Sequence, residues 1–193
     1  MDRTNRVIQA RRWAHCFCGR VFVVVLLLLS LLFSNAAVAS DGVERAGDIL
    51  QVVLPVSGAG IALARDDKEG LMQLAKSGAL TLALTFVVKN TIPATRPDGG
   101  DQSFPSGHTS VSFSAAEFIR ERYGWNYGIP AYVVASYVGY SRVESKRHYT
   151  RDVIAGAVIG IGSSLLFTEP YKDWLIKPAV ASTFYGVNLS HVW

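Results

Sequence analysis

The chain has 193 residues, 50% of them hydrophobic, with 19 basic and 15 acidic side chains. This length fits a single domain with ample apolar surface for a core. The positive balance is local, because five arginines precede residue 40 against Asp2 alone, and the remainder holds 14 basic and 14 acidic residues. A neutral body excludes the extended basic surface of a nucleic-acid-binding protein.

The first 39 residues are typical of an export segment. An arginine-rich start is followed by the apolar run VFVVVLLLLSLLF at 21–33 and by small residues at Ala37 and Ala39. This order is the pattern of a bacterial signal peptide. The apolar stretch 21–39 is also long enough to remain as a first transmembrane helix, with the arginines on the cytoplasmic side. In both cases we expect the rest of the chain to be directed outward.

Cys16 and Cys18 are the only cysteines, and both lie in this segment. The sequence therefore predicts no disulfide framework. Their C-x-C spacing without a second pair is a weak metal signal, and we expect neither a metal nor a cofactor.

Apolar segments of helical length recur after the leader, separated by short polar connectors. They predict an all-α fold, a bundle of about five to six helices when the leader is counted, in a single domain. The expected helices are 47–64, 71–92, 107–122, 128–141 and 149–167. The tail ASTFYGVNLSHVW alternates loosely, which fits a strand or a membrane-surface segment, and receives no assignment.

The bundle is either embedded in a membrane or soluble. Several segments are short of ~20 clean apolar residues, and Lys76 and Glu117 interrupt two of them, as in a soluble bundle. Gly156, Gly160 and Ser164 form a row of small residues of the kind on which membrane helices pack. We favour the membrane. With the arginine-rich end inside, the 90–106 connector and the SRVESKRH turn then meet at the same outer end.

Three stretches at that end carry candidate chemistry. Lys89 near a helix end and Arg96 in the following connector predict an anion cradle. In the Pro-Ser-Gly-His stretch, Ser106 stands where an N-cap stands, so free backbone amides face any anion in front of the helix that follows. Taken singly, a solvated charged loop and an ordinary cap are the better explanations of these features.

The third stretch contains Arg142, His148 and Asp152. On a helix, His148 and Asp152 at i, i+4 share one face. A carboxylate there accepts a hydrogen bond from one ring nitrogen and leaves the lone pair of the other available as a nucleophile. Arg142 is placed to neutralise an anion bound beside the ring.

Together these stretches resemble the type 2 phosphatidic acid phosphatase superfamily, which includes bacterial acid phosphatases and vanadium haloperoxidases. The likeness covers about 47–167. The pattern Lys, six residues, Arg-Pro, then Pro-Ser-Gly-His, then Ser-Arg, five residues, His, three residues, Asp is met at Lys89, Arg96, Pro97, Pro105, Ser106, Gly107, His108, Ser141, Arg142, His148 and Asp152.

The resemblance implies that His148 attacks phosphorus, that Asp152 orients it and that His108 protonates the leaving group. It also implies that the phosphoryl oxygens are held by Lys89, Arg96, Ser106, Gly107 and Arg142, without a metal. We therefore expect 1–39 to be a signal peptide or first transmembrane helix and 40–193 to be a phosphatase domain. Its active site would face the periplasm and would act on a phosphorylated lipid through a phosphohistidine.

Several alternatives remain open from the residues. A soluble periplasmic acid phosphatase would act on small phosphomonoesters, a vanadate-dependent haloperoxidase would use the same pocket for vanadate, and a non-catalytic membrane protein would need neither histidine. Phosphatidate, phosphatidylglycerol phosphate, undecaprenyl pyrophosphate and lipid A phosphate all present the same phosphoryl group. The sequence does not choose between them, and it does not indicate an oligomeric state.

Overall fold

The computed structural model describes residues 40–171, 174–181 and 184–191. The arginine-rich leader, the two cysteines Cys16 and Cys18, and the choice between a signal peptide and a first transmembrane helix lie outside these residues.

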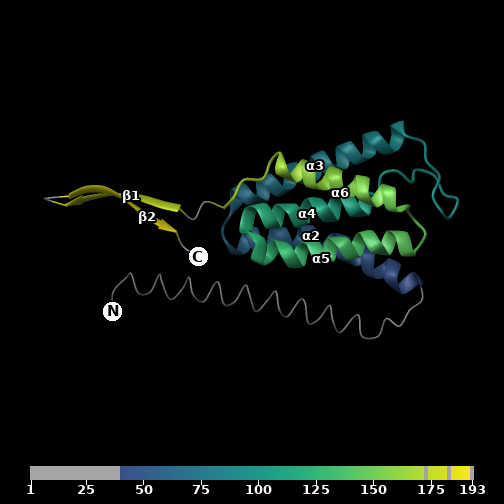
Figure 1. Cartoon of the computed structure of the whole chain (residues 1–193), viewed down its shortest axis with the longest axis horizontal. Coiled ribbons are helices and arrows are strands. Elements are labelled where there is room, and N and C mark those ends of the chain that lie inside the picture. Colours follow the sequence, from purple (N-terminus) through teal and green to yellow (C-terminus); the bar gives the residue numbers. More distant parts are fainter. Residues whose placement is uncertain (1–39, 172–173, 182–183, 192–193) are drawn as a thin grey trace.

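Five helices and one hairpin make up the described chain (Figure 1). Each of the five helices expected from the sequence is present, and the all-α bundle is confirmed. The elements are α2 (Ser40–Ala64), α3 (Lys68–Thr91), α4 (Gly107–Tyr123), α5 (Trp125–Glu144), α6 (Thr150–Leu165), β1 (Trp174–Ala181) and β2 (Phe184–His191).

The helix limits follow from local chemistry at most ends. The side chain of Asp67 caps α3 by accepting from the Gly70 amide, and Ser106 caps α4. Gly124, with φ of +88°, makes the sharp break between α4 and α5 that a residue with a side chain would resist. Only α2 differs clearly, because it begins at Ser40 rather than at residue 47. Its polar first turns carry Glu44, whose contacts with other elements are described below.

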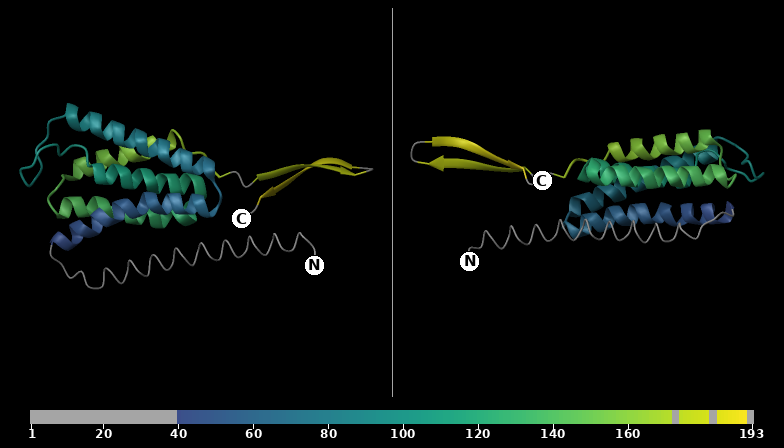
Figure 2. Two further views of the ribbon diagram at one scale, coloured as in Figure 1. Left: turned by 180° about the vertical axis from the view of Figure 1, so that it is seen from behind. Right: turned by 60° about the horizontal axis from the view of Figure 1, so that its bottom comes forward.

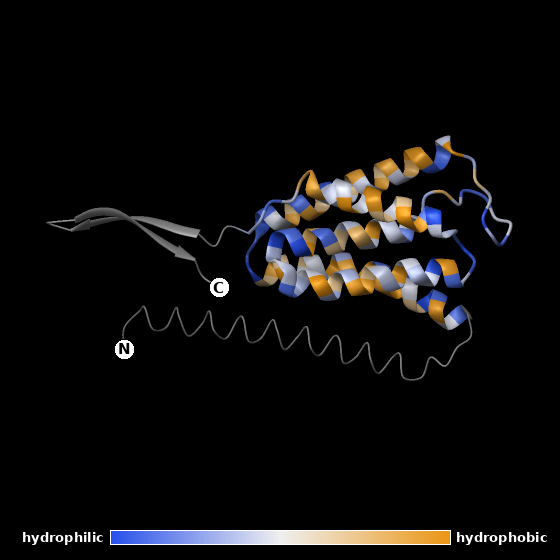
Figure 3. Ribbon diagram, in the orientation of Figure 1, coloured by the Kyte–Doolittle hydropathy of each residue, from blue (hydrophilic) through white to orange (hydrophobic). Residues whose placement is uncertain are grey.

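The side-chain distribution of α3 is the reverse of that in a soluble bundle. Its buried positions are Gly70, Gln73, Ser77, Thr81 and Thr85, a small and polar stripe. Its exposed face carries large apolar side chains, and the same holds for the outer faces of α2, α5 and α6 (Figure 3). The exposed set on α3 includes Met72, Leu82, Leu84, Phe86 and Val87.

This distribution fits a lipid environment, in which helices bury small and hydroxyl residues against one another and expose apolar side chains to the lipid chains. By length and composition, α2 and α3 are each able to cross a membrane.

Helix α4 lies at the centre and contacts each of the other four helices. Its apolar side, with Phe118 and Ile119, packs on α2 and α5 in one hydrophobic cluster. Its hydroxyl side faces α3, where Thr81 donates to Ser114 at 3.0 Å and Thr85 pairs with Ser110 at 2.9 Å. Glu117 is buried in α4 and paired with Arg120, so this charge does not disrupt the bundle.

The row of small residues predicted on α6 forms its contact with α4. A Cβ atom at Gly156 would lie 2.5 Å from the Ser106 carbonyl oxygen, and one at Gly160 would lie 2.2 Å from that of Ser110. Both distances are shorter than any real Cβ contact, so the two backbones approach as closely as glycine allows. The close approach brings the first turns of α4 and α6 together.

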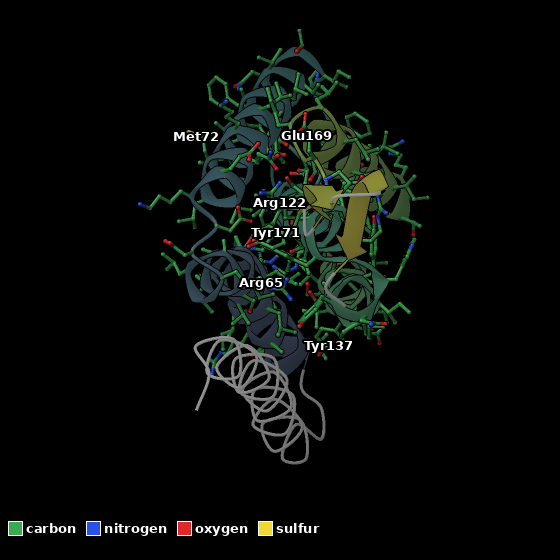
Figure 4. The ribbon with its side chains drawn as sticks, turned by 90° about the vertical axis from the view of Figure 1, so that its left-hand side faces the viewer. Arg65, Met72, Arg122, Tyr137, Glu169 and Tyr171 are labelled. Carbon is green, nitrogen blue, oxygen red and sulfur yellow. The ribbon has the colours of Figure 1, made fainter. Side chains whose placement is uncertain are left out.

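The end of the bundle away from the 92–106 connector is closed by buried ion pairing. Arg122 donates to both carboxylate oxygens of Asp67, at 2.6 and 2.8 Å, and to the carbonyl of Glu169. With the Gly70 amide and the Tyr123 hydroxyl, the Asp67 carboxylate accepts four hydrogen bonds among the described residues. Figure 4 views this end and shows Arg65, Arg122 and Tyr171 gathered near the bundle axis; Arg65 lies 5.6 Å from the Tyr171 ring centre.

The tail left unassigned by the sequence is an antiparallel hairpin. Its register pairs Trp174 with His191 and Ala181 with Phe184. Figure 2 shows that the hairpin leaves the bundle at the end opposite the 92–106 connector, and its strands pack on none of the described helices. The loose alternation of apolar and polar residues in the tail therefore corresponds to a two-stranded hairpin outside the helical bundle.

The glycine contact between α4 and α6 yields a stability prediction. Gly160→Ala should lower the free energy of unfolding by about 1–3 kcal/mol, because the new methyl group meets the backbone of α4. Gly162→Ala is the matched control, since a Cβ atom there meets nothing within 4 Å and both changes raise helix propensity equally. Thermal unfolding of both variants in detergent measures the difference. Equal melting temperatures would contradict the close packing.

Candidate active site

The residues singled out by the sequence converge at one end of the bundle. The 92–106 connector, the first turn of α4, the end of α5 and the 145–149 connector meet there with the first turns of α2. They enclose a cavity of about 290 Å³. Its lining residues are Glu44, Asp48, Arg96, His108, Arg142, Arg147 and His148. The expected convergence of the two histidine stretches is thus present in the fold.

His148 and Asp152 are paired, but not on one helix as the spacing predicts. His148 lies in the connector before α6, and Asp152 occupies the third position of that helix. The carboxylate reaches back across the helix start, accepting from the Tyr149 amide at 3.0 Å, and lies 3.6 Å from Nδ1 of His148. Ser103 donates a hydrogen bond to the same carboxylate oxygen. Asp152 therefore joins the two connectors behind the histidine ring.

The histidine is held neutral by its surroundings. His148 is 4% exposed, and burial together with the positive charges of Lys89 and Arg96 lowers its pKa to about 4, against the opposing effect of Asp152. Within the described part of the chain, neither Nδ1 of His148 nor Oδ1 of Asp152 has a hydrogen-bond partner. A neutral ring keeps one nitrogen lone pair, which is what a nucleophile or base requires.

The start of α4 has the local geometry that favours anion binding. Ser106 caps the helix, accepting from the amide of Thr109 at 3.4 Å and from its hydroxyl at 3.0 Å. Its own amide donates to the carbonyl of Asp152 at 2.9 Å. The amides of Gly107 and His108 belong to the first turn of the helix, where the first amides have no partner within the helix.

The three predicted cations surround this end at different depths. Arg96 and Arg142 line the cavity, and Nε of Arg96 is buried without a partner among the described residues. Arg142 is 2% exposed, and its guanidinium donates to Asp48 and to the carbonyl of Glu44. Lys89 lies outside the cavity lining and donates to the carbonyl of Gln102 at 2.6 Å. Lys89 acts on the site by lowering the pKa of His148 through its positive charge, and it does not line the cavity.

Sequence reasoning missed the acidic side of the cavity. Asp48 of α2 accepts from Arg142 at 2.8 Å and lies 3.0 Å from Nε2 of His108. At the mouth, Arg147 bridges Glu44 and Asp98 at 2.8 and 2.9 Å. The spacing of four residues between Glu44 and Asp48 puts both on one face of α2, but nothing in the sequence indicates which helix that face meets.

The described residues include no group of three or more histidine, cysteine or acidic side chains suited to a metal ion. The cavity instead places cationic side chains and helix amides around a neutral, buried histidine, with a second histidine opposite. Fixed positive donors of this kind stabilise the charge of a phosphoryl group in transfer. The fold and the site define a helical membrane enzyme that acts on phosphoryl groups.

Comparison with known proteins places the chain in a family. The model of the PAP2 superfamily matches residues 70–174. The "Lipid A 4'-phosphatase" of Helicobacter pylori (strain J99) is 32% identical over 169 residues, which cover 78% of this chain and 85% of that protein. The chain therefore belongs to the PAP2 superfamily, and the predicted resemblance is confirmed.

Two solved structures share the fold. The crystal structure of Aquifex aeolicus LpxE aligns with a TM-score of 0.51 and 23% identity, covering 73% of this chain and 92% of that one. That of a transmembrane PAP2 type phosphatidylglycerolphosphate phosphatase from Bacillus subtilis aligns with a TM-score of 0.53 and 22% identity, covering 83% and 92%. The apolar outer faces, together with two helices long enough to cross a membrane, favour the membrane-embedded bundle over the soluble one.

The position of Lys89 yields a prediction for the pKa of His148. Lys89→Met removes one of the positive charges that lower this pKa, so the pKa should rise from about 4 toward the ordinary value near 6.5. Burial of the ring persists, so the rise should be partial. NMR titration of histidine-labelled protein in detergent, assigned with a His148→Asn variant, measures the shift.

Lys76→Met is the matched control for this titration. Lys76 lies on the exposed face of the same helix, roughly 20 Å from Lys89 along the helix axis. It should leave the pKa of His148 unchanged. A Lys89→Met variant that titrates like the control would show that the Lys89 charge does not reach the ring.

Proposed function

We propose that this membrane lipid phosphatase removes a phosphate from a lipid through a covalent phosphohistidine on His148, at the periplasmic face of the inner membrane. The observation that carries the proposal is the arrangement around His148: a ring held neutral by burial, a carboxylate behind it, and a cationic cavity in front of it. Residues 40–193 would be the phosphatase domain, and 1–39 its signal peptide or first transmembrane helix.

In the first half-reaction, the lone pair on Nε2 of His148 attacks phosphorus. The bond from phosphorus to the lipid oxygen breaks, its electron pair stays on that oxygen, and a proton from the His108 ring neutralises it. Asp152 accepts from Nδ1 as positive charge develops on the His148 ring. The present separation of 3.6 Å needs to shorten for this contact, as catalytic hydrogen bonds often do once a substrate binds.

In the second half-reaction, a water molecule attacks the phosphohistidine. The neutral His108 ring takes a proton from that water, the bond between phosphorus and nitrogen breaks, and its electron pair returns to His148. Throughout, Arg96, Arg142 and the amides at the start of α4 hold the phosphoryl oxygens, and Lys89 adds its charge from behind Gln102. The donor set stabilises the charge spread over those oxygens.

A lipid A phosphate is the substrate that we propose to test first, because the relative from Helicobacter pylori carries a lipid A activity in its name and matches most of this chain. The apolar outer faces of the helices support a substrate that reaches the cavity from the bilayer. Assays on lipid A and on phosphatidate, in mixed micelles, separate a sugar-linked phosphate from a glycerol-linked one.

Two substitutions separate the roles of the histidines. His148→Ala removes the attacking atom, so activity on every substrate should fall to background. His108→Ala removes the proton donor and should slow hydrolysis of an alkyl or sugar phosphate by about 10² to 10⁴. The loss should be much smaller on p-nitrophenyl phosphate, whose leaving group scarcely needs a proton. Steady-state rates on both substrate types measure the difference.

Trapping with ³²P-labelled substrate provides the direct control, because labelled protein should appear in the wild type and be absent from His148→Ala. Residual turnover and label in His148→Ala would refute the phosphohistidine. Equal losses on both substrates in His108→Ala would refute its role as the acid.

The orientation of the cavity is testable by labelling. In a protein with Cys16 and Cys18 replaced by serine, cysteine is introduced at Asp101 in the connector beside the cavity, or at Lys68 at the opposite end. An impermeant maleimide added to intact spheroplasts should label only the Asp101→Cys protein, since only that end faces the periplasm. Lysed spheroplasts should label both. Labelling of Lys68→Cys alone in intact spheroplasts would reverse the proposed orientation.

A further inference from the structure

One carboxylate oxygen in the cavity is shared by two groups that the sequence motifs do not link. Oδ1 of Asp48 accepts from Nη1 of Arg142 at 2.8 Å and lies 3.0 Å from Nε2 of His108. Asp48 comes from α2, whereas Arg142 ends α5 and His108 opens α4. A single oxygen atom therefore fixes the distance between a phosphate-binding arginine and the proposed acid.

We propose that Asp48 is a positioning residue for the general acid, holding the His108 ring against Arg142 and stabilising its protonated form. The inference rests on the proposed function, because it assumes that His108 protonates the leaving group. It adds a residue outside the three sequence motifs and assigns α2 a part in the chemistry.

The hydrogen bonds of Arg142 support this assignment. Its Nη1 donates to Asp48, its Nη2 to the carbonyl of Glu44, and its Nε to the hydroxyl of Ser141. These bonds use three of the five N–H groups that a guanidinium offers. The protein thus anchors Arg142 from α2 while N–H groups remain for phosphoryl oxygens. Because His108 contacts the same carboxylate, its ring is placed relative to that anchor.

Asp48 also bears on the charge of His108. His108 lies in the first turn of α4, outside the two apolar spans, and burial lowers its pKa, as do the charges of Arg142 and Arg96. Asp48 opposes these effects by Coulomb attraction and by its hydrogen bond. The other charged or titratable groups that line the cavity are Glu44, Arg147 and His148. Among these groups, Asp48 is the acid in direct contact with the ring.

The protonation of His108 determines how the rate depends on pH at the alkaline side. His108 must carry its proton to act, so activity is lost as pH rises through its pKa in the enzyme. Removing the carboxylate removes a charge that raises this pKa, so the alkaline limb of the rate profile moves to lower pH. Asparagine has the same shape as aspartate, so the replacement leaves no cavity. The Asp48 side chain is also 46% exposed, so the change does not bury an unpaired polar group.

The test uses the full-length protein in detergent with the substitution Asp48→Asn. We expect the rate on an alkyl or sugar phosphate to fall by about 10-fold to 100-fold, less than the loss of a whole acid. The loss on p-nitrophenyl phosphate should be several-fold smaller, and the alkaline limb should shift to lower pH. Asp48→Glu, which restores a carboxylate, should recover the position of that limb.

Glu144→Gln is the matched control. It makes the same change of charge at an exposed position near the same end of the bundle, away from the cavity lining, and should alter neither the ratio of rates nor the limb. Equal losses on the two substrates in Asp48→Asn, or an unmoved alkaline limb, would overturn the inference.

The outcome separates this inference from the proposed function. If His108→Ala shows the selective loss on poor leaving groups and Asp48→Asn does not, His108 remains the acid and only the role of Asp48 is refuted. If His148→Ala retains turnover, the phosphohistidine mechanism itself fails, whatever Asp48→Asn does.

Discussion

The site depends on the close crossing of α4 and α6. Gly156 and Gly160 allow the two backbones to touch, and the Ser106 amide then donates to the carbonyl of Asp152 at 2.9 Å. This crossing sets the start of α4, where an anion can be held, beside the start of α6, where Asp152 backs the histidine. A side chain at either glycine would separate the two starts, so the packing of the bundle and the geometry of the cavity are one constraint.

The two ends of the bundle differ in how fully their buried polar groups are hydrogen-bonded. At the end closed by Asp67 and Arg122, both oxygens of the carboxylate are bonded, which is what stability requires of a buried ion pair. At the cavity end, polar atoms of Arg96, His148 and Asp152 are buried without hydrogen-bond partners among the described residues. Unsatisfied buried groups are costly, and a bound phosphoryl oxygen would accept the hydrogen bond that Nε of Arg96 does not make among the described residues.

Charge also distinguishes the surroundings of the two histidines in the cavity. Burial and nearby cations lower the pKa of both rings, to about 4 for His148, and at His108 the contact with Asp48 at 3.0 Å opposes this effect. In the mechanism that we propose, environment rather than residue type separates the nucleophile from the acid. The two environments are built by α2, α4, α5 and both connectors.

The sequence alone determined the helices, their order and four of the residues that line the cavity, namely Arg96, His108, Arg142 and His148. Hydrophobic runs set the five helices to within a few residues, except that α2 extends to Ser40 through polar turns whose partners lie far along the chain. Caps and motif spacing located Ser106, His148 and Asp152 because these signals are local. The tail gave no clear period, and its hairpin pairs residues across a turn without packing on the helices.

Tertiary structure decided how those residues meet. Whether Asp48 faces the cavity depends on how α2 rotates against α4 and α5, and no local pattern encodes that rotation. Likewise, Lys89 matches the motif, yet it lies behind the connector and bonds the Gln102 carbonyl rather than lining the cavity. His148 precedes α6 instead of lying on it, because the helix begins at Thr150. The Asp152 side chain accepts a hydrogen bond from the backbone amide of the N-cap residue Tyr149. Such relations join elements distant in sequence, so only the packed bundle fixes them.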